Sequence, residues 1–122
     1  MVRNLSFAVL AAATLTYSSF SANAAASDTQ RAYDAARRCY VANGHVYDSF
    51  KQSGDAANTS LFEAKAKKSF DLAYSYGHQL HLSNDEIATD IHQTTDVELR
   101  KLLADSAYLT TVAKDCKYWG MM

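Results

Sequence analysis

Residues 27–53 read SDTQRAYDAARRCYVANGHVYDSFKQS, and this stretch decides the fold that the sequence predicts. Small or apolar residues recur in it at alternating spacings of four and three, the period of one helix face. The residues on this face are Ala32, Ala36, Cys39, Asn43, Val46 and Phe50. Ser27 and Gln30 have the spacing of a capping box, and Gly54 is a typical residue after a helix end. The stretch therefore predicts one long amphipathic helix from Ser27 to Ser53.

The segment before this helix has the layout of a secretory signal peptide. It begins with the basic Arg3 and continues with an apolar run from Leu5 to Leu15. Small residues then offer cleavage sites after Ala24 or Ala26. A transmembrane anchor needs about 20 apolar residues, and the polar residues that follow the run keep it below that length. We therefore expect residues 1–26 to be cleaved. Residues 27–122 should form a single domain, periplasmic or secreted, without stable insertion in a membrane.

The charge balance disfavours nucleic acid as a partner. Loss of Arg3 from 12 basic and 13 acidic side chains leaves a net charge near −2. Nucleic-acid binding needs a clustered basic surface, which this balance does not supply. The one basic run, at Lys65, Lys67 and Lys68, shares its predicted helix with acidic residues and fits a solvated face.

The two cysteines, Cys39 and Cys116, are expected to form a disulfide. An exported protein meets an oxidising compartment, where an even cysteine count favours a bond. Neither cysteine has a second one at the spacing of a redox or haem-attachment motif. The bond would close a loop of roughly 77 residues, which the chain-entropy model values on the order of 4–5 kcal/mol. It would tie the last helix to the first.

A second and a third helix are predicted after the first. The second begins at Asn58 or Ser60 and keeps the helical period to about His81. The third begins after Ser83, which has Glu86 at the capping-box spacing. This helix is short, because only two large apolar residues follow before a pair of threonines.

A long fourth helix is predicted from Asp96 to about Tyr118, with Thr95 and Glu98 repeating the capping-box spacing. One bent helix running through Thr94 is the alternative for the third and fourth. The chain has no proline, and its few β-branched residues lie inside helical patterns. We predict an all-α fold in the manner of an irregular four-helix bundle. It has two long helices, a short third and a long fourth, with the disulfide joining the first and last.

An antiparallel arrangement of the first and last helices fixes a register around the bridge. Gly44 then faces Ala113, and Phe50 faces the beginning of the last helix. A glycine inside a helix costs about 1 kcal/mol relative to alanine, so we expect close backbone approach at Gly44. The tail should continue toward the start of the first helix, where Trp119 covers small residues such as Ala35.

Tyrosine is the most unusual feature of the composition. All eight tyrosines except Tyr17 follow the predicted cleavage site, and Tyr33, Tyr40 and Tyr47 are spaced by seven residues. Such a stripe fits a partner-binding face, since tyrosine is favoured at interfaces. It equally fits the wet edge of a small core. Together with Trp119, these residues are the predicted surface anchors for a protein partner.

Catalytic and metal-binding signatures are weak. No nucleophile elbow or glycine-rich phosphate loop is present in the sequence. His78 and His81 lie one helical turn apart, which gives the alternative of a small-ligand, haem or metal carrier. Two neighbouring histidines make an incomplete ligand set, and a helix C-terminus accounts for them. We therefore predict a non-enzymatic protein without a cofactor. It would act through protein contacts, in the class of inhibitors, immunity proteins or chaperones.

Overall fold

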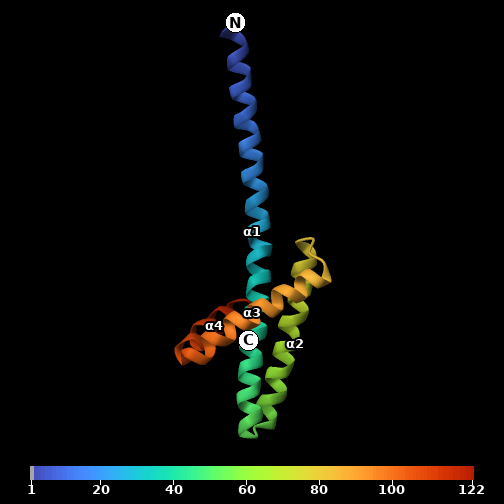
Figure 1. Ribbon diagram of the computed structural model, residues 1–122, viewed down its shortest axis with the longest axis vertical. Coiled ribbons are helices and arrows are strands. Elements are labelled where there is room, and N and C mark those ends of the chain that lie inside the picture. The colour runs from blue at the N-terminus through green and yellow to red at the C-terminus, as the bar shows by residue number, and fades with distance from the viewer. Residues whose placement is uncertain (1) are drawn as a thin grey trace.

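The computed structural model describes the backbone of residues 2–122 and the side chains of residues 28–122. It contains four helices: α1 (Val2–Ser53), α2 (Ala56–Gln79), α3 (Asn84–Ala104) and α4 (Ser106–Tyr118). Over residues 2–122 there is no strand. The predicted all-α class with four helices is confirmed, and Figure 1 shows the arrangement.

α1 ends as predicted, but it does not begin at Ser27. The helix runs through that residue in the full chain, because its bounds are Val2–Ser53. The predicted signal peptide, its cleavage site and the cap at Ser27 fall on residues 1–27, outside the described side chains. After Ser53 the backbone of Gly54 has a φ of 79°, a left-handed conformation that favours glycine after a helix. The described part of the chain holds no helix with the length and apolar character needed to span a membrane.

α2 starts earlier than predicted and returns antiparallel to α1 (Figure 1). Its N-cap is Asp55, whose carboxylate accepts a hydrogen bond from the Asn58 backbone N–H at 3.0 Å. This bond lowers the pKa of Asp55 below its usual range. The predicted starts at Asn58 or Ser60 are therefore wrong. Aspartate is a preferred N-cap, so Asp55 satisfies the first-turn amides before either later residue is reached.

Small and aromatic residues hold α1 against α2. Ala42 of α1 and Ala73 of α2 have no exposed surface, which lets the two helices approach closely. The Tyr40 and Phe70 ring centroids lie 5.3 Å apart. Phe50 stacks on Phe62, with centroids 5.6 Å apart. The prediction that Phe50 faces the last helix is therefore wrong, because α2 already covers this part of α1.

α3 begins as predicted and continues beyond its predicted end. Ser83 and Glu86 form the expected capping box. The helix then runs through Thr94 and Thr95, which agrees with the alternative of a continuous helix there. The Thr95 hydroxyl donates to the Ile91 carbonyl oxygen at 2.8 Å instead of capping a new helix.

The break between α3 and α4 lies at Asp105. Its carboxylate accepts a hydrogen bond from the Ala107 N–H at 3.0 Å and so caps α4. α3 therefore has 21 residues and α4 has 13, which reverses the predicted short third and long fourth helices. An aspartate cap decides the boundary here, as Asp55 does for α2.

The disulfide between Cys39 and Cys116 is confirmed, and both cysteines are fully buried. α3 and α4 run across α1 rather than alongside it (Figure 1), so the predicted antiparallel register is wrong. No atom lies within 4 Å of a Cβ built on Gly44, which excludes the expected close approach of Ala113. Helices pack at several preferred crossing angles, and a single bridge does not choose among them.

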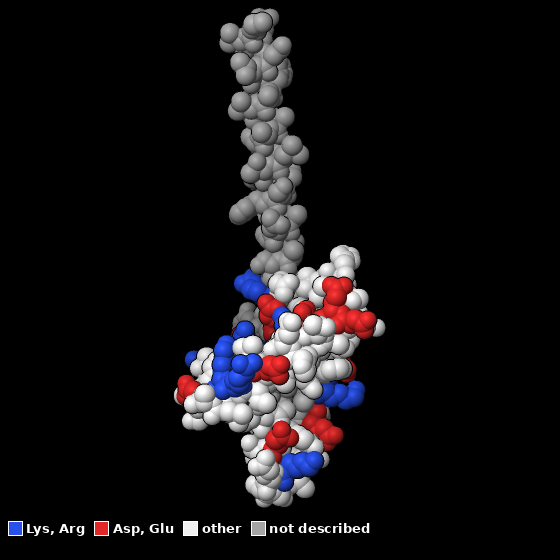
Figure 2. All heavy atoms as spheres, in the orientation of Figure 1, with Lys and Arg blue, Asp and Glu red and all other residues white. Residues whose placement is uncertain are grey.

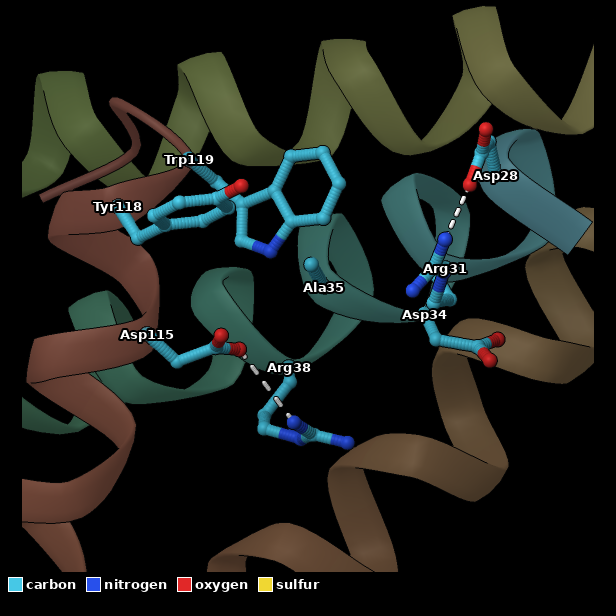
Figure 3. Close-up of a pocket in the computed structure, with 8 residues that line it drawn as sticks. All are labelled: Asp28, Arg31, Asp34, Ala35, Arg38, Asp115, Tyr118 and Trp119. Atoms are coloured by element: carbon cyan, nitrogen blue, oxygen red, sulfur yellow. Dashed lines mark hydrogen bonds and ion pairs between the residues drawn. The ribbon is translucent and has the colours of Figure 1, made fainter.

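The C-terminal tail folds back over the middle of α1. Gly120 has a φ of 69°, which lets the chain reverse after Trp119. The carbonyl oxygen of Met121 then accepts a hydrogen bond from the buried Asn43 amide at 2.8 Å. The tail therefore does not run toward the start of α1. The expected position of Trp119 beside Ala35 is nevertheless observed (Figure 3).

Candidate functional site

Tyr33 belongs to the core and not to the surface. Its side chain is 1% exposed, and its hydroxyl donates to the Asp90 carboxylate at 2.7 Å. The Arg37 guanidinium lies 4.4 Å from the ring centroid. Burial, followed by the bond to Asp90, raises the pKa of Tyr33. The ring is thus not available as a surface anchor, and the wet-edge interpretation of the stripe also fails here.

Tyr40 and Tyr47 are half-buried and line one groove of about 370 Å³, which we call the tyrosine groove. Three helices build it, since α2 and α3 each supply residues beside the face of α1. The groove is lined by Tyr40, Val41, Gly44, His45, Tyr47, Asp48, Glu63, Ala66, Thr95 and Leu99. The spacing of Tyr40, Gly44 and Tyr47 places them on one helix face, so the sequence brings them together locally.

The floor and walls of the tyrosine groove are mostly apolar. Gly44 leaves open space above the α1 backbone, because nothing lies within 4 Å of where its Cβ would be. Val41 is buried beside it, while Leu99 of α3 keeps 37% of its surface exposed. An exposed leucine beside two tyrosine rings forms an apolar surface that no described residue covers. This surface is a candidate for contact with another molecule.

The rim of the tyrosine groove carries negative charge. Asp48 and Glu63 are exposed, and neither makes an ion pair or a side-chain hydrogen bond with another described residue. The groove lining contains no lysine or arginine. Lys51 lies outside the lining, with its ammonium nitrogen 5.6 Å from the Tyr47 ring centroid. The groove is therefore apolar inside and acidic at its edge.

A second groove, of about 610 Å³, lies where α1 meets the end of α4 (Figure 3). We call it the arginine groove, and it is lined by Asp28, Arg31, Asp34, Ala35, Arg38, Asp115, Tyr118 and Trp119. Its charges are paired: Arg31 binds Asp28, Arg38 Nη1 lies 3.5 Å from the Asp115 carboxylate, and Asp34 binds Arg37 outside the lining. A charged ligand would have to break these pairs. This favours the tyrosine groove as the candidate site.

Two aromatic residues stand at the edge of the arginine groove. The rings of Tyr118 and Trp119 are perpendicular, with centroids 5.5 Å apart. Tyr118 is 82% exposed, whereas Trp119 is partly covered. Trp119 was predicted as an anchor in one set with Tyr40 and Tyr47. In the structure these residues line two separate grooves, and Tyr118 beside Trp119 was not among the predicted anchors.

Glu98 is a buried carboxylate that sequence reasoning placed wrongly at a helix start. It is 6% exposed and lies 3.5 Å from Arg38 Nε and 3.9 Å from Lys101 Nζ. It also accepts a hydrogen bond from the Tyr108 hydroxyl. Burial, then this bond, raises the pKa of Tyr108 to about 12. Glu98 lies seven residues after the buried Ile91, and this helical spacing was the signal for its burial.

His78 and His81 are not gathered into a ligand set. His78 Nε2 lies 2.7 Å from the Asn84 side-chain oxygen, and both histidines are exposed. His81 follows the end of α2 with a φ of 63°. Within residues 28–122, no group of three or more histidine, cysteine, aspartate or glutamate side chains is arranged to hold a metal ion. Both histidines lie at the turn between α2 and α3, where His78 contacts Asn84.

Charges of both signs are interspersed over the face drawn in Figure 2, and neither sign forms a continuous stripe there. The chain matches no protein-family model, no curated protein and no solved structure. Its function has to be inferred from the residues described above.

Proposed function

We propose that this chain is a small exported, non-enzymatic protein that binds a partner protein through the tyrosine groove. One observation carries the proposal: Tyr40, Tyr47 and Leu99 surround an open space above Gly44. Tyrosines at the centre of a concave surface are typical binding anchors, because they bury a large ring and still offer a hydroxyl. The role belongs to the class of inhibitors, immunity proteins or chaperones.

Export is the second part of the proposal. The buried Cys39–Cys116 disulfide supports it, because such bonds persist in oxidising compartments. A periplasmic or secreted location would follow from removal of residues 1–26 as a signal peptide. Intact-mass measurement of the exported protein should then give a species that begins within a few residues of Ser27. A mass that still includes Met1 or Arg3 would contradict the signal assignment.

Partner binding is tested by photo-crosslinking in the native compartment. A photo-reactive residue replaces Tyr47 in one variant and Thr111, an exposed α4 residue outside both grooves, in the control. We expect a discrete protein adduct from position 47 and none from position 111. The position-47 adduct should disappear when Gly44→Leu is added, because leucine fills the groove. Equal adducts from both positions, or an adduct that survives Gly44→Leu, would remove the groove from the proposal.

The carrier alternative is separated by spectroscopy. A haem or metal carrier isolated from its compartment would show bound colour or stoichiometric metal. A contact protein would be isolated without either. Replacing His78 and His81 together by glutamine should leave the free energy of unfolding within roughly 1 kcal/mol, as surface changes usually do. Loss of a bound metal in that variant would favour the carrier instead.

A further inference from the structure

We infer that the tyrosine groove takes a basic partner segment, whose large apolar side chain enters the space above Gly44. This inference rests on the proposed function and specifies the chemistry of the partner. The occupant is a peptide segment with an apolar anchor next to lysine or arginine. Three features of the groove argue for it: the glycine at its floor, the apolar walls and the acidic rim.

Packing within the chain does not explain why position 44, at the floor of the groove, is a glycine. Glycine inside a helix is unfavourable relative to alanine, so a mid-helix glycine usually marks a close neighbour. Gly77 of α2 has such neighbours, since its Cβ would lie 2.6 Å from Ile87 and 3.2 Å from Tyr33. Gly44 has none within 4 Å. The missing side chain at position 44 instead preserves the depth of the groove.

The walls select the apolar part of the occupant. Tyr40 and Tyr47 supply ring surface from α1, and Leu99 supplies an aliphatic wall from α3. The buried Val41 adds an apolar surface at the base. Burial of apolar surface is the main source of affinity at such a site. A single large apolar side chain, entering beside Gly44, would touch all four residues.

The rim selects the charge of the occupant. Asp48 of α1 and Glu63 of α2 lie at the edge of the same groove. No described cation forms an ion pair with either carboxylate. Exposed ion pairs add little affinity, but complementary charge speeds association and rejects like-charged partners. Lysine or arginine beside the apolar anchor therefore fits the groove, and an acidic segment is repelled. The arginine groove lacks this one-sided charge, because each of its arginines and aspartates is already in an ion pair.

The test is a selection from a phage-displayed library of random peptides on the purified protein with its disulfide intact. Gly44→Leu serves for counter-selection, and recovered peptides are synthesised for anisotropy measurements. We expect sequences with one large apolar residue flanked by lysine or arginine. Gly44→Leu should weaken their binding at least about 30-fold, the loss typical of a central anchor. Asp48→Asn with Glu63→Gln should weaken binding by about 3- to 10-fold and reduce its salt dependence.

Control variants separate groove filling from misfolding. Gly44→Ala fills less of the space and should weaken binding less than Gly44→Leu, while the circular dichroism spectrum of both stays native. Acidic or uncharged peptides that still discriminate against Gly44→Leu would overturn the basic partner and leave the proposed function standing. Peptides that bind both proteins equally would overturn the site itself. A dimer in sedimentation that Gly44→Leu abolishes would identify a second copy of the chain as the occupant and overturn the inference.

Discussion

The α1–α2 pair and the attachment of α4 are stabilised in different ways. α1 and α2 pack through buried alanines and through aromatic pairs such as Tyr40 with Phe70. α4 has 13 residues, of which only Val112 and Cys116 are buried. It is tied to α1 by the disulfide, and the tail after it by the hydrogen bond from Asn43. Many small packing contacts hold the α1–α2 interface, whereas the attachment of α4 depends on a few specific bonds.

Removing the disulfide should have the largest effect and should act mainly on α4. Replacing Cys39 and Cys116 together by alanine frees a loop of 77 residues in the unfolded chain. We expect the free energy of unfolding to fall on the order of 4 kcal/mol, measured by urea denaturation with far-UV circular dichroism. Alanine leaves no unpaired thiol, and the measured loss includes the two buried sulfur atoms as well as the bond.

Trp119 shows whether the two interfaces separate when the bond is lost. It is the only tryptophan in the chain and lies in the groove between α1 and the end of α4. Its emission should be blue-shifted in the oxidised protein and move to the red on reduction, while the helicity of α1 and α2 persists. Loss of helicity and of the Trp119 signal in one step would show that the two interfaces form a single cooperative unit.

The same contrast explains which parts of the fold the sequence predicts. Local signals were sufficient for the capping box at Ser83 and for the end of α1 at Gly54. The cysteine pairing needed only the even count and the expected oxidising compartment. The crossing of α4 over α1 depends on side-chain packing along three helices at once, which periodicity does not encode. Asp105 competes as a cap with Thr95, which has Glu98 at the capping-box spacing.

The candidate site was predicted in part for the same reason. Tyr40 and Tyr47 share one face of α1, so their meeting in one groove follows from a single helix. Leu99 joins them only because α3 crosses α1 at this point. Tyr33 has the same spacing as the other two tyrosines but is buried beneath α3. Helical spacing identifies a face, while the neighbouring helix decides which of its residues stay exposed.

Alanine substitutions at the helical glycines Gly77 and Gly44 test local packing and have a smaller expected effect. Gly77→Ala introduces a methyl group into the contact with Ile87 and Tyr33, where overpacking costs about 1–3 kcal/mol. The gain in helix propensity offsets part of this cost, so a net loss of about 1 kcal/mol is expected. Gly44→Ala meets no neighbour and should raise the free energy of unfolding by about 0.5–1 kcal/mol. If urea denaturation shows changes of opposite sign in the free energy of unfolding of the two variants, Gly77 serves packing and Gly44 does not. Changes of the same sign would contradict this.

Two tyrosine–carboxylate pairs can be compared at alkaline pH. Tyr33 links α1 to Asp90 of α3, and Tyr108 links α4 to Glu98 of α3. Burial and the bond to Glu98 raise the pKa of Tyr108 to about 12, so the folded protein holds this proton more tightly than the unfolded chain. The stabilisation is complete below the ordinary tyrosine pKa of about 10 and is lost as the pH rises toward 12.

Unfolding measured from pH 9 to 12 should therefore show a decline in stability that is less steep in Tyr108→Phe than in the unsubstituted protein. Tyr33→Phe should also flatten the decline, because burial and Asp90 raise the pKa of Tyr33 in the same direction. Tyr118→Phe is the matched control, since that side chain is 82% exposed and should leave the slope unchanged. At neutral pH, Tyr108→Phe should cost less than about 1 kcal/mol, because Glu98 keeps Arg38 and Lys101 as partners. An unchanged alkaline slope in Tyr108→Phe would mean that α4 does not depend on this link, leaving the disulfide, the buried Val112 and the Arg38–Asp115 pair to hold it.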